Sequence, residues 1–389
     1  MNSSRNIWLL NLSTFFFFLG ASSLNPIVSP FSMTFNASPF IVGVLAGITS
    51  VVSLFSKPVG GLVGDRGYRL EAMILGNILS LVSGVLYVVS ALVSNIWLFA
   101  FTRALHGFSM GIFYPSSLST AVDLAPAGRV GETLGWRGMM FSLGNIVGPA
   151  LGGYASDYFG FAGAFFLVVL FSAIGALFVV PVRRDVGKIA VSGKKSEKAG
   201  YSELLRLHFV AVSVALLFFS ASYSGVTTFL PALYKELSYP QRVFGRYMMI
   251  VGVASFATRL IGGKSADRMG PIPVSAAGLL AVITGYLLLI RATLPPASYA
   301  SAVFIGAGFG LAVPAMQFMA LGNLPQRIRT MGSSVYTMFF DLGTMGGQFA
   351  LGYAAESLGY AGILKFLPAL AGIALLILAV AYFAGDENG

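Results

Sequence analysis

The chain has 389 residues, of which 56% are hydrophobic and only 10% are charged, and its formal net charge is +10. Soluble domains carry about 25% charged residues, so this composition excludes the two or three soluble domains that the length would otherwise suggest. Apolar stretches of about 20 residues recur instead, and each can cross a ~30 Å hydrocarbon core as a helix. The composition therefore predicts an all-α polytopic membrane protein.

Twelve apolar segments meet this length requirement, and we predict that each is a transmembrane helix. In chain order they cover residues 7–33, 39–64, 70–93, 96–122, 132–157, 160–182, 207–235, 241–267, 271–291, 296–322, 329–356 and 359–384. A run of four phenylalanines, residues 15–18, falls in the first segment, and we expect it to face lipid.

The Lys and Arg residues are concentrated at one of the two ends of these segments. Fifteen of the 24 lie at the N-terminus or in the loops after the second, fourth, sixth, eighth and tenth segments, whereas five lie at the opposite ends. Because cytoplasmic loops carry an excess of Lys and Arg, we expect a multi-pass protein of the cytoplasmic membrane with both termini in the cytoplasm. The basic balance then reflects topology, and we expect no nucleic-acid partner.

The chain lacks the residues that several kinds of catalytic and cofactor site need. The chain has no cysteine, which excludes disulfides and thiolate metal sites, and its histidines are His106 and His208 alone. GGKS at 262–265 matches the end of a phosphate-binding loop, but Thr258 stands where the first glycine is required. The first apolar segment is too long for a cleavable signal peptide. We therefore expect no metal, no cofactor and no enzymatic activity, and in particular no ATPase engine.

The sequence repeats itself at an offset of about 200 residues. GGLVGDR at 60–66 matches GGKSADR at 262–268, and SLGNIVGPALGGYASDYFGFAG at 142–163 matches DLGTMGGQFALGYAAESLGYAG at 341–362. Such self-similarity indicates two copies of one structural unit.

The repeat divides the chain into two six-helix halves. Pro115 and Pro314 are equivalent in it. We predict an N-terminal bundle over residues 1–182 and a C-terminal bundle over residues 207–389. The polar, basic segment 183–206 is rich in Gly, Ser and Lys, which is typical of a flexible linker, and we place it in the cytoplasm.

The loop between the second and third segments carries a charged motif that the second half repeats. Its residues are Gly61, Asp65, Arg66 and Arg69 in the first half and Gly263, Asp267, Arg268 and Gly270 in the second. This pattern resembles the loop signature of the major facilitator superfamily of secondary transporters, although Gly67-Tyr68 stands where the family has Xaa-Gly. The resemblance covers essentially the whole chain and implies the fold of that family.

Two further motifs carry the resemblance. RALHG at 103–107 is similar to the family's Arg-x-x-Gln-Gly, with His106 in place of glutamine. The fifth segment matches a glycine and proline pattern associated with exporters, which consists of Gly144, Gly148, Pro149, Gly152 and Gly153. Small residues at every fourth position also let helices approach closely, so packing alone is the alternative to an antiporter role.

The resemblance implies a gating role for the loop motif. Asp65 and Arg66 lie at the end of the second segment, where the family's aspartate clasps the cytoplasmic end of the eleventh helix. Charges at a membrane edge are ordinarily just solvated, and that is the alternative.

A few ionisable residues lie deep inside the predicted helices. They are Lys57, Arg103, His106, Arg137, Arg259 and Asp341. A charge that faces lipid is costly, so we expect these groups to face the interhelical cavity or one another. The cations outnumber the single carboxylate, and the excess of positive charge favours an anionic substrate.

Lys57 and Arg259 occupy equivalent depths in the two halves. Each precedes the aspartate of its loop motif by eight residues, which places it ~12 Å inside the cytoplasmic edge of a helix. A pseudo-twofold axis relates such positions, and we expect the two cations to bind a carboxylate or another oxyanion near the midplane. Nitrate and monocarboxylate transporters of the superfamily resemble this pattern. The alternative is that either cation pairs with Asp341 or with backbone carbonyls and locks a conformation.

Asp341 is the only acid deep in the predicted helices and is therefore the natural proton carrier. It lies twelve residues beyond Arg329, ~18 Å into the eleventh segment. A permanent salt bridge is the alternative role. His106, close to Arg103, can relay protons or can simply form hydrogen bonds in place of the family's glutamine.

Three polar side chains, Asn25, Tyr114 and Gln317, complete the candidate substrate site. These features predict a proton-coupled secondary transporter that moves a small organic or inorganic anion by alternating access, with the anion bound between Lys57 and Arg259. The alternative is a proton-coupled efflux antiporter for drugs, sugars or other neutral or cationic metabolites, and a passive channel or a non-transporting receptor are the other classes. We expect a monomer in the lipid bilayer that binds a small molecule and protons.

Overall fold

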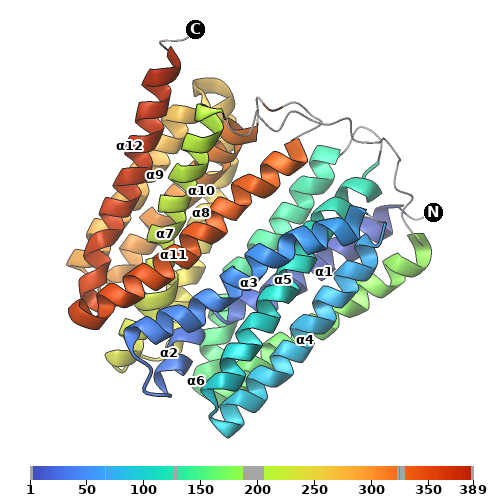
Figure 1. Cartoon of the computed structure of the whole chain (residues 1–389), viewed down its shortest axis with the longest axis horizontal. Coiled ribbons are helices and arrows are strands. Elements are labelled where there is room, and N and C mark those ends of the chain that lie inside the picture. The colour runs from blue at the N-terminus through green and yellow to red at the C-terminus, as the bar shows by residue number, and fades with distance from the viewer. Residues whose placement is uncertain are drawn as a thin grey trace. The chain divides into compact units, whose positions relative to one another are not determined.

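The computed structural model describes residues 3–65, 67–126, 130–186, 206–321, 324 and 329–386, and the regular elements in these ranges are all helices (Figure 1). The first six are α1 (Ser3–Ser23), α2 (Val28–Met33), α3 (Pro39–Asp65), α4 (Arg69–Val93), α5 (Ile96–Leu124) and α6 (Val130–Val186). The others are α7 (Leu207–Glu236), α8 (Gln241–Met269), α9 (Pro271–Arg291), α10 (Ser298–Leu321), α11 (Arg329–Ile363), the 3-10 turn η2 (Leu364–Phe366) and α12 (Leu367–Asp386). A helix satisfies every backbone N–H and C=O within one segment, as hydrocarbon requires.

Nine helical stretches among the described residues are long and apolar enough to cross a membrane. Two of them have 52 and 46 residues, which is more than one crossing needs at ~1.5 Å per residue. Each of these two contains a glycine with positive φ, Gly160 in α6 (φ 69°) and Gly359 in α11 (φ 68°). Glycine adopts this backbone without a Cβ penalty, so both long helices break at equivalent positions of the repeat. The count of twelve helices stays a prediction.

The first predicted segment is not one continuous helix. Helix α1 ends at Ser23, a turn covers residues 24–27, and α2 follows. Pro26 lies in this turn, and a proline has no N–H for the helical ladder and collides with the preceding turn of a helix. Asn25, which we expected within a helix, therefore lies half-buried in the turn.

The described residues form two compact units. The first unit contains α1 to α6 together with Tyr234–Met249, and the second contains the rest of α7 and α8 together with α9 to α12. Helices α7 and α8 therefore each pass from one unit to the other, and the turn between them belongs to the first unit. The predicted bundle boundaries stay predictions, and residues 187–205 of the predicted linker lie outside the described residues.

In the first unit, α6 packs along α1 and α4, and α5 packs along α3 and α4. The interior is aromatic: Phe17 stacks on Phe113 with ring centroids 3.8 Å apart, and Phe18 packs edge-on against Phe141. Phe17 and Phe18 are buried, so the expectation that the run 15–18 faces lipid is wrong for these two residues. Four consecutive residues span a whole turn of a helix, and such a run cannot lie on one face.

In the second unit, α9 packs along α10 and α12. A Cβ at Gly278 of α9 would overlap Ala312 of α10, so the glycine lets the two backbones approach closely. Ser222 of α7 and Tyr286 of α9 share a hydrogen bond of 3.1 Å in the buried interior. Close backbone contact and buried polar pairs thus hold this unit together.

The glycines of the fifth-segment pattern form the contact between α6 and α1. Gly144, Gly148 and Gly152 face α1 so closely that an added Cβ would overlap its backbone. Gly153 faces the start of α8 instead, against Arg242. These contacts support the packing role, and the exporter role of the pattern stays a prediction.

We expect Gly152→Ala to lower the free energy of unfolding by about 1–3 kcal/mol, because the new methyl group would overlap the carbonyl oxygen of Ser23 in α1. The matched control is Gly138→Ala in the same helix, where no atom lies within 4 Å of the added Cβ. Alanine is the better helix former, so the control should be neutral or slightly stabilising. Thermal unfolding of the purified protein in detergent measures both changes, and equal stability of the two variants would contradict this packing.

Candidate functional site

The interior of the first unit holds two cations beside one tyrosine. The Nζ atom of Lys57 lies 5.9 Å from the ring centroid of Tyr114, and Cζ of Arg137 lies 5.1 Å from the same centroid. The three residues come from α3, α5 and α6. An aromatic face attracts cations through its quadrupole, which lets Tyr114 hold two positive charges close together. Lys57, Tyr114 and Arg137 are called the cation cluster below.

A close crossing of α3 and α5 brings Lys57 and Tyr114 together. Gly60 of α3 lies against the carbonyl of Gly111 and the ring of Pro115 in α5, with no room for a Cβ. Lys57 precedes Gly60 by three residues and Tyr114 follows Gly111 by three residues, so each lies about one helical turn from the crossing. The small residues therefore determine where the two side chains meet.

Arg137 is 4% exposed and is held by neutral groups. Its Nε and Nη2 donate to the hydroxyl of Ser117 at 3.1 and 2.6 Å, and Nη2 donates to the carbonyl of Tyr114 at 3.3 Å. A hydroxyl and a carbonyl satisfy N–H donors but carry no negative charge. These partners therefore leave the positive charge of Arg137 uncompensated.

Arg103 lies in a separate polar group of the first unit. Its Nε donates to the carbonyl of Leu45 at 3.0 Å and its Nη2 donates to that of Ala46 at 2.6 Å, which ties α5 to α3. The ring centroid of His106 lies 5.8 Å from that of Tyr87. Both ring nitrogens of His106 are buried and have no hydrogen-bond partner among the described residues. The proton-relay role of Arg103 and His106 stays a prediction.

Ion pairs join three helices at the end of the first unit that carries the loop motif. Arg69 at the start of α4 pairs with Asp123 near the end of α5. Glu71 of α4 pairs with Arg183 in the last turn of α6, with 3.0 Å between Oε1 and Nη2. An acid in the first turn of a helix and a base in the last turn also suit the partial charges of the helix ends.

The rest of the loop motif is only partly described. Gly67 and Gly270 both have φ 86°, but Gly270 directly precedes α9 whereas Tyr68 stands between Gly67 and α4. Arg268 is exposed, and an added Cβ at Gly61 would meet no atom within 4 Å. The residues or side chains outside the description are Asp65, Arg66, Gly263 and Asp267. The gating role stays a prediction.

Asp157 of α6 caps the start of α8. Its Oδ1 accepts the backbone N–H of Gln241 at 2.7 Å, and its Oδ2 accepts that of Arg242 at 3.0 Å and lies 3.6 Å from Nη1 of the same arginine. The first N–H groups of a helix have no partner within it, and the preceding Pro240 has no side-chain acceptor. A carboxylate from another helix thus satisfies two donors and the positive helix end together.

We expect Asp157→Ala to speed hydrogen exchange at the amides of Gln241 and Arg242 by about 5- to 30-fold, because a lost helix cap costs about 1–2 kcal/mol. The control is Glu356→Ala, which removes the acid at the equivalent position of the repeat in the second unit. Hydrogen exchange followed by mass spectrometry measures the peptides around residues 238–246. Unchanged exchange in Asp157→Ala would show that the carboxylate does not hold this helix end.

The candidates of the second half lie on three helices of the second unit. Arg259 is in α8, Gln317 in α10 and Asp341 in α11. Arg259 and Asp341 are half-buried, whereas Gln317 is exposed. Their roles in substrate binding and proton coupling stay predictions.

A family model described as the Major Facilitator Superfamily matches residues 10–348 and 247–388, which together cover most of the chain. The chain belongs to this superfamily. The predicted family is confirmed, and with it an all-helical, multi-pass transporter of the membrane rather than an enzyme. Members of the superfamily bind small-molecule substrates.

Sequence relatives within the superfamily cover nearly the whole chain. The multidrug resistance protein MdtG of Dickeya zeae is 26% identical over 374 residues, which is 92% of this chain and 90% of the relative. An uncharacterized MFS-type transporter of Methanocaldococcus jannaschii is 22% identical over 374 residues, covering 93% of this chain and 94% of the relative.

Solved structures of the superfamily share the fold. A bacterial homolog of the human lysosomal transporter Spinster, inward-facing and unoccupied, has a TM-score of 0.80 and 16% identity, over 99% of this chain and 97% of the other. The human organic anion transporter MFSD10 has a TM-score of 0.69 and 17% identity, over 97% of this chain and 100% of the other. At these identities the similarity concerns the fold alone.

Sequence reasoning missed three residues of these sites. Arg137 stood out as a deep cation but not as a neighbour of Tyr114, and Ser117 carried no signal. Asp157 had a signal, because Glu356 is its equivalent in the internal repeat and both copies thus keep an acid there. Its partners at the start of α8 could not be found from spacing alone.

Proposed function

We propose that this member of the superfamily is a secondary active transporter for a small organic anion with an aromatic or other apolar part. The cation cluster carries the proposal: two cations from α3 and α6 lie within 6 Å of the centroid of one aromatic ring. Ammonium and guanidinium groups bind a carboxylate by charge-assisted hydrogen bonds, and the ring of Tyr114 offers a surface for the apolar part. The proposal includes the prediction that Arg259 of the second half also binds the anion.

A second candidate is the export of drugs or other neutral or cationic metabolites. It is supported by the relatives named as multidrug resistance proteins and by the exporter-type glycine pattern of α6. The cation cluster argues against a cationic substrate at this place, because like charges repel in a medium of low dielectric constant.

The transport mechanism that we propose is alternating access by rocking of the two halves around a central site, coupled to protons through Asp341. The course of α7 and α8 supports it, since each helix passes from one compact unit to the other. Asp157 fixes the turn between these two helices to α6. The proposed location is the cytoplasmic membrane, with both termini in the cytoplasm and a monomeric transporter.

The test is a comparison of substrate classes with the purified protein. Thermal stabilisation is measured first with aromatic carboxylates, aliphatic carboxylates, nitrate, sugars and cationic drugs, and counterflow in proteoliposomes then follows the best binder. We expect saturable exchange of a carboxylate. Stabilisation and exchange by cationic drugs alone would favour the second candidate, binding without exchange would indicate a receptor, and flux without saturation would indicate a channel.

A further inference from the structure

A cavity of about 420 Å³ lies in the first unit where the turn between α7 and α8 meets α6. Its walls include Asp157 and Phe161 of α6 and Lys235 and Gln241 at the ends of α7 and α8. It lies near the break of α6 at Gly160, which also lines it. A cavity of this size can hold a small organic molecule.

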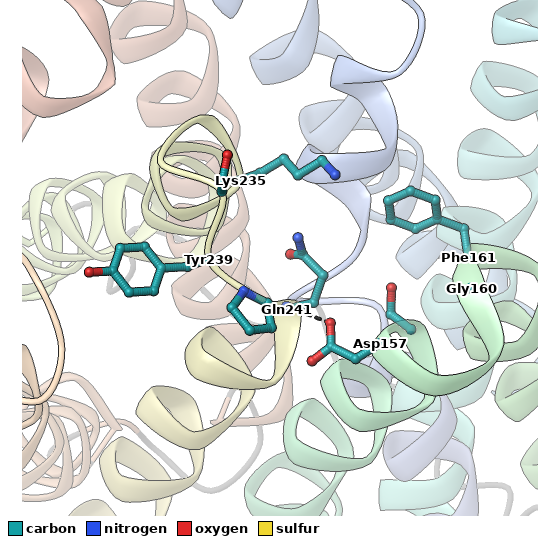
Figure 2. A pocket seen from close by; sticks show the side chains of 9 residues that line it. Asp157, Gly160, Phe161, Lys235, Tyr239 and Gln241 are labelled. Atoms are coloured by element: carbon teal, nitrogen blue, oxygen red, sulfur yellow. Dashed lines mark hydrogen bonds between the residues drawn. The ribbon is translucent and has the colours of Figure 1, made fainter.

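Gln241 contributes an acceptor that lacks a donor. The residue is 6% exposed, and its Oε1 has no hydrogen-bond partner among the described residues. Figure 2 shows the amide rising from the start of α8 into the cavity, below the end of the Lys235 side chain. A buried polar atom without a partner costs stability, so this carbonyl is suited to accept a donor from an incoming molecule.

Lys235 contributes positive charge to the same cavity. It is exposed, and within the part of the chain that the structure describes its ammonium forms no ion pair. Asp157 does not compete for it, because that carboxylate already accepts two backbone N–H groups of α8 and faces Arg242. The ammonium can therefore bind an anionic group.

Phe161 supplies an apolar wall. Figure 2 shows its ring directed into the same space as Lys235 and Gln241, whereas the ring of Tyr239 points away from it. The three groups thus present a cation, an acceptor and an aromatic face to one cavity.

We infer that this cavity is an accessory binding site, apart from the cation cluster, for a small carboxylate that carries its own hydrogen-bond donor. The carboxylate would bind Lys235, a hydroxyl or ammonium of the ligand would donate to Oε1 of Gln241, and its apolar part would pack on Phe161. Hydroxycarboxylates and amino acids with an apolar side chain have this chemistry.

The probes are 3-phenyllactate and L-phenylalanine, with 3-phenylpropionate as the analogue that lacks the donor. Calorimetric titration and thermal unfolding are measured on the full chain in detergent. We expect at least one of the two donor-bearing probes to bind and to raise the Tm, and 3-phenylpropionate to bind more weakly. Absence of binding by both probes would overturn the inference and leave the cavity as space for water.

Three variants locate the site. Gln241→Met keeps the side-chain length and the backbone N–H that Asp157 accepts, so its Tm without ligand should equal or exceed that of the wild type. Gln241→Met and Lys235→Gln should each weaken probe binding by about tenfold or more. Lys365→Gln, which removes an exposed positive charge that does not line this cavity, should leave probe binding unchanged. Unweakened binding in the first two variants, or loss in Lys365→Gln, would overturn the inference while leaving the proposed transport function open.

Discussion

Lys57→Gln is expected to weaken binding of the best anionic substrate by about 30-fold or more. Loss of one partner from a desolvated, charged contact costs on the order of 2–5 kcal/mol. Lys57 is half-buried, and its Nζ lies 5.9 Å from the centroid of Tyr114, beside Arg137. Removal of one cation from this cluster therefore lowers the attraction for an anion directly.

Substitutions of Arg259, the predicted partner of Lys57 from the second half, should give a graded loss of anion binding. Arg259 has a planar guanidinium that can bind a carboxylate with two parallel hydrogen bonds, whereas lysine offers a compact point charge. Arg259→Lys should therefore weaken binding, and Arg259→Gln should weaken it further.

The measurement for both cations is isothermal titration of the best anion with variants that are first shown to be folded. Lys365→Gln is the matched control, because it removes one exposed positive charge far along the chain from the cluster residues. Unchanged affinity in both Lys57→Gln and Arg259→Gln would end the anion proposal and leave the two residues as structural locks.

Asp341→Asn is expected to abolish substrate-driven proton movement. Asparagine keeps the size of the side chain, but its amide does not bind and release a proton as a carboxylate does. Asp341 lies half-buried in α11, about 18 Å along the helix from Arg329. A carrier at this depth can pass a proton between the two sides of a membrane protein as the conformation changes.

Proteoliposomes with a pH-sensitive dye inside measure proton movement, and counterflow of labelled substrate measures exchange in the same preparation. The Asp341→Asn variant should lose proton movement and can keep counterflow of the substrate, because exchange needs no net proton transfer. Glu356→Gln is the control, since it neutralises an exposed acid of the same helix. Proton movement at the wild-type rate in Asp341→Asn would show that the carrier lies elsewhere or that coupling is absent.

The sequence by itself determined the class, the family and most helix positions. Apolar length alone predicts a membrane-spanning helix, because the thickness of the hydrocarbon core sets the required number of residues. The predicted segment 271–291 and helix α9 (Pro271–Arg291) coincide for this reason. The internal repeat placed Gly160 and Gly359 at equivalent positions, and both break a long helix with the same positive φ.

Only the tertiary structure decided which faces of the helices meet. In a soluble protein the polar face of a helix reveals its orientation, but lipid is as apolar as a protein interior, so a membrane helix lacks that contrast. The run of phenylalanines shows the consequence, since Phe17 and Phe18 point into the first unit although its sequence resembles a lipid-facing surface.

The same limit applies to the sites. Lys57 and Tyr114 lie on different helices, and they meet because Gly60 and Gly111 let α3 and α5 cross closely. Asp157 and the start of α8 are separated by more than 80 residues, and a missing local cap at Pro240 gives no sign of which acid supplies it. The sequence identifies side chains that need a partner, but tertiary packing determines which partner each one meets. The distances between side chains on different helices follow from how whole helices cross.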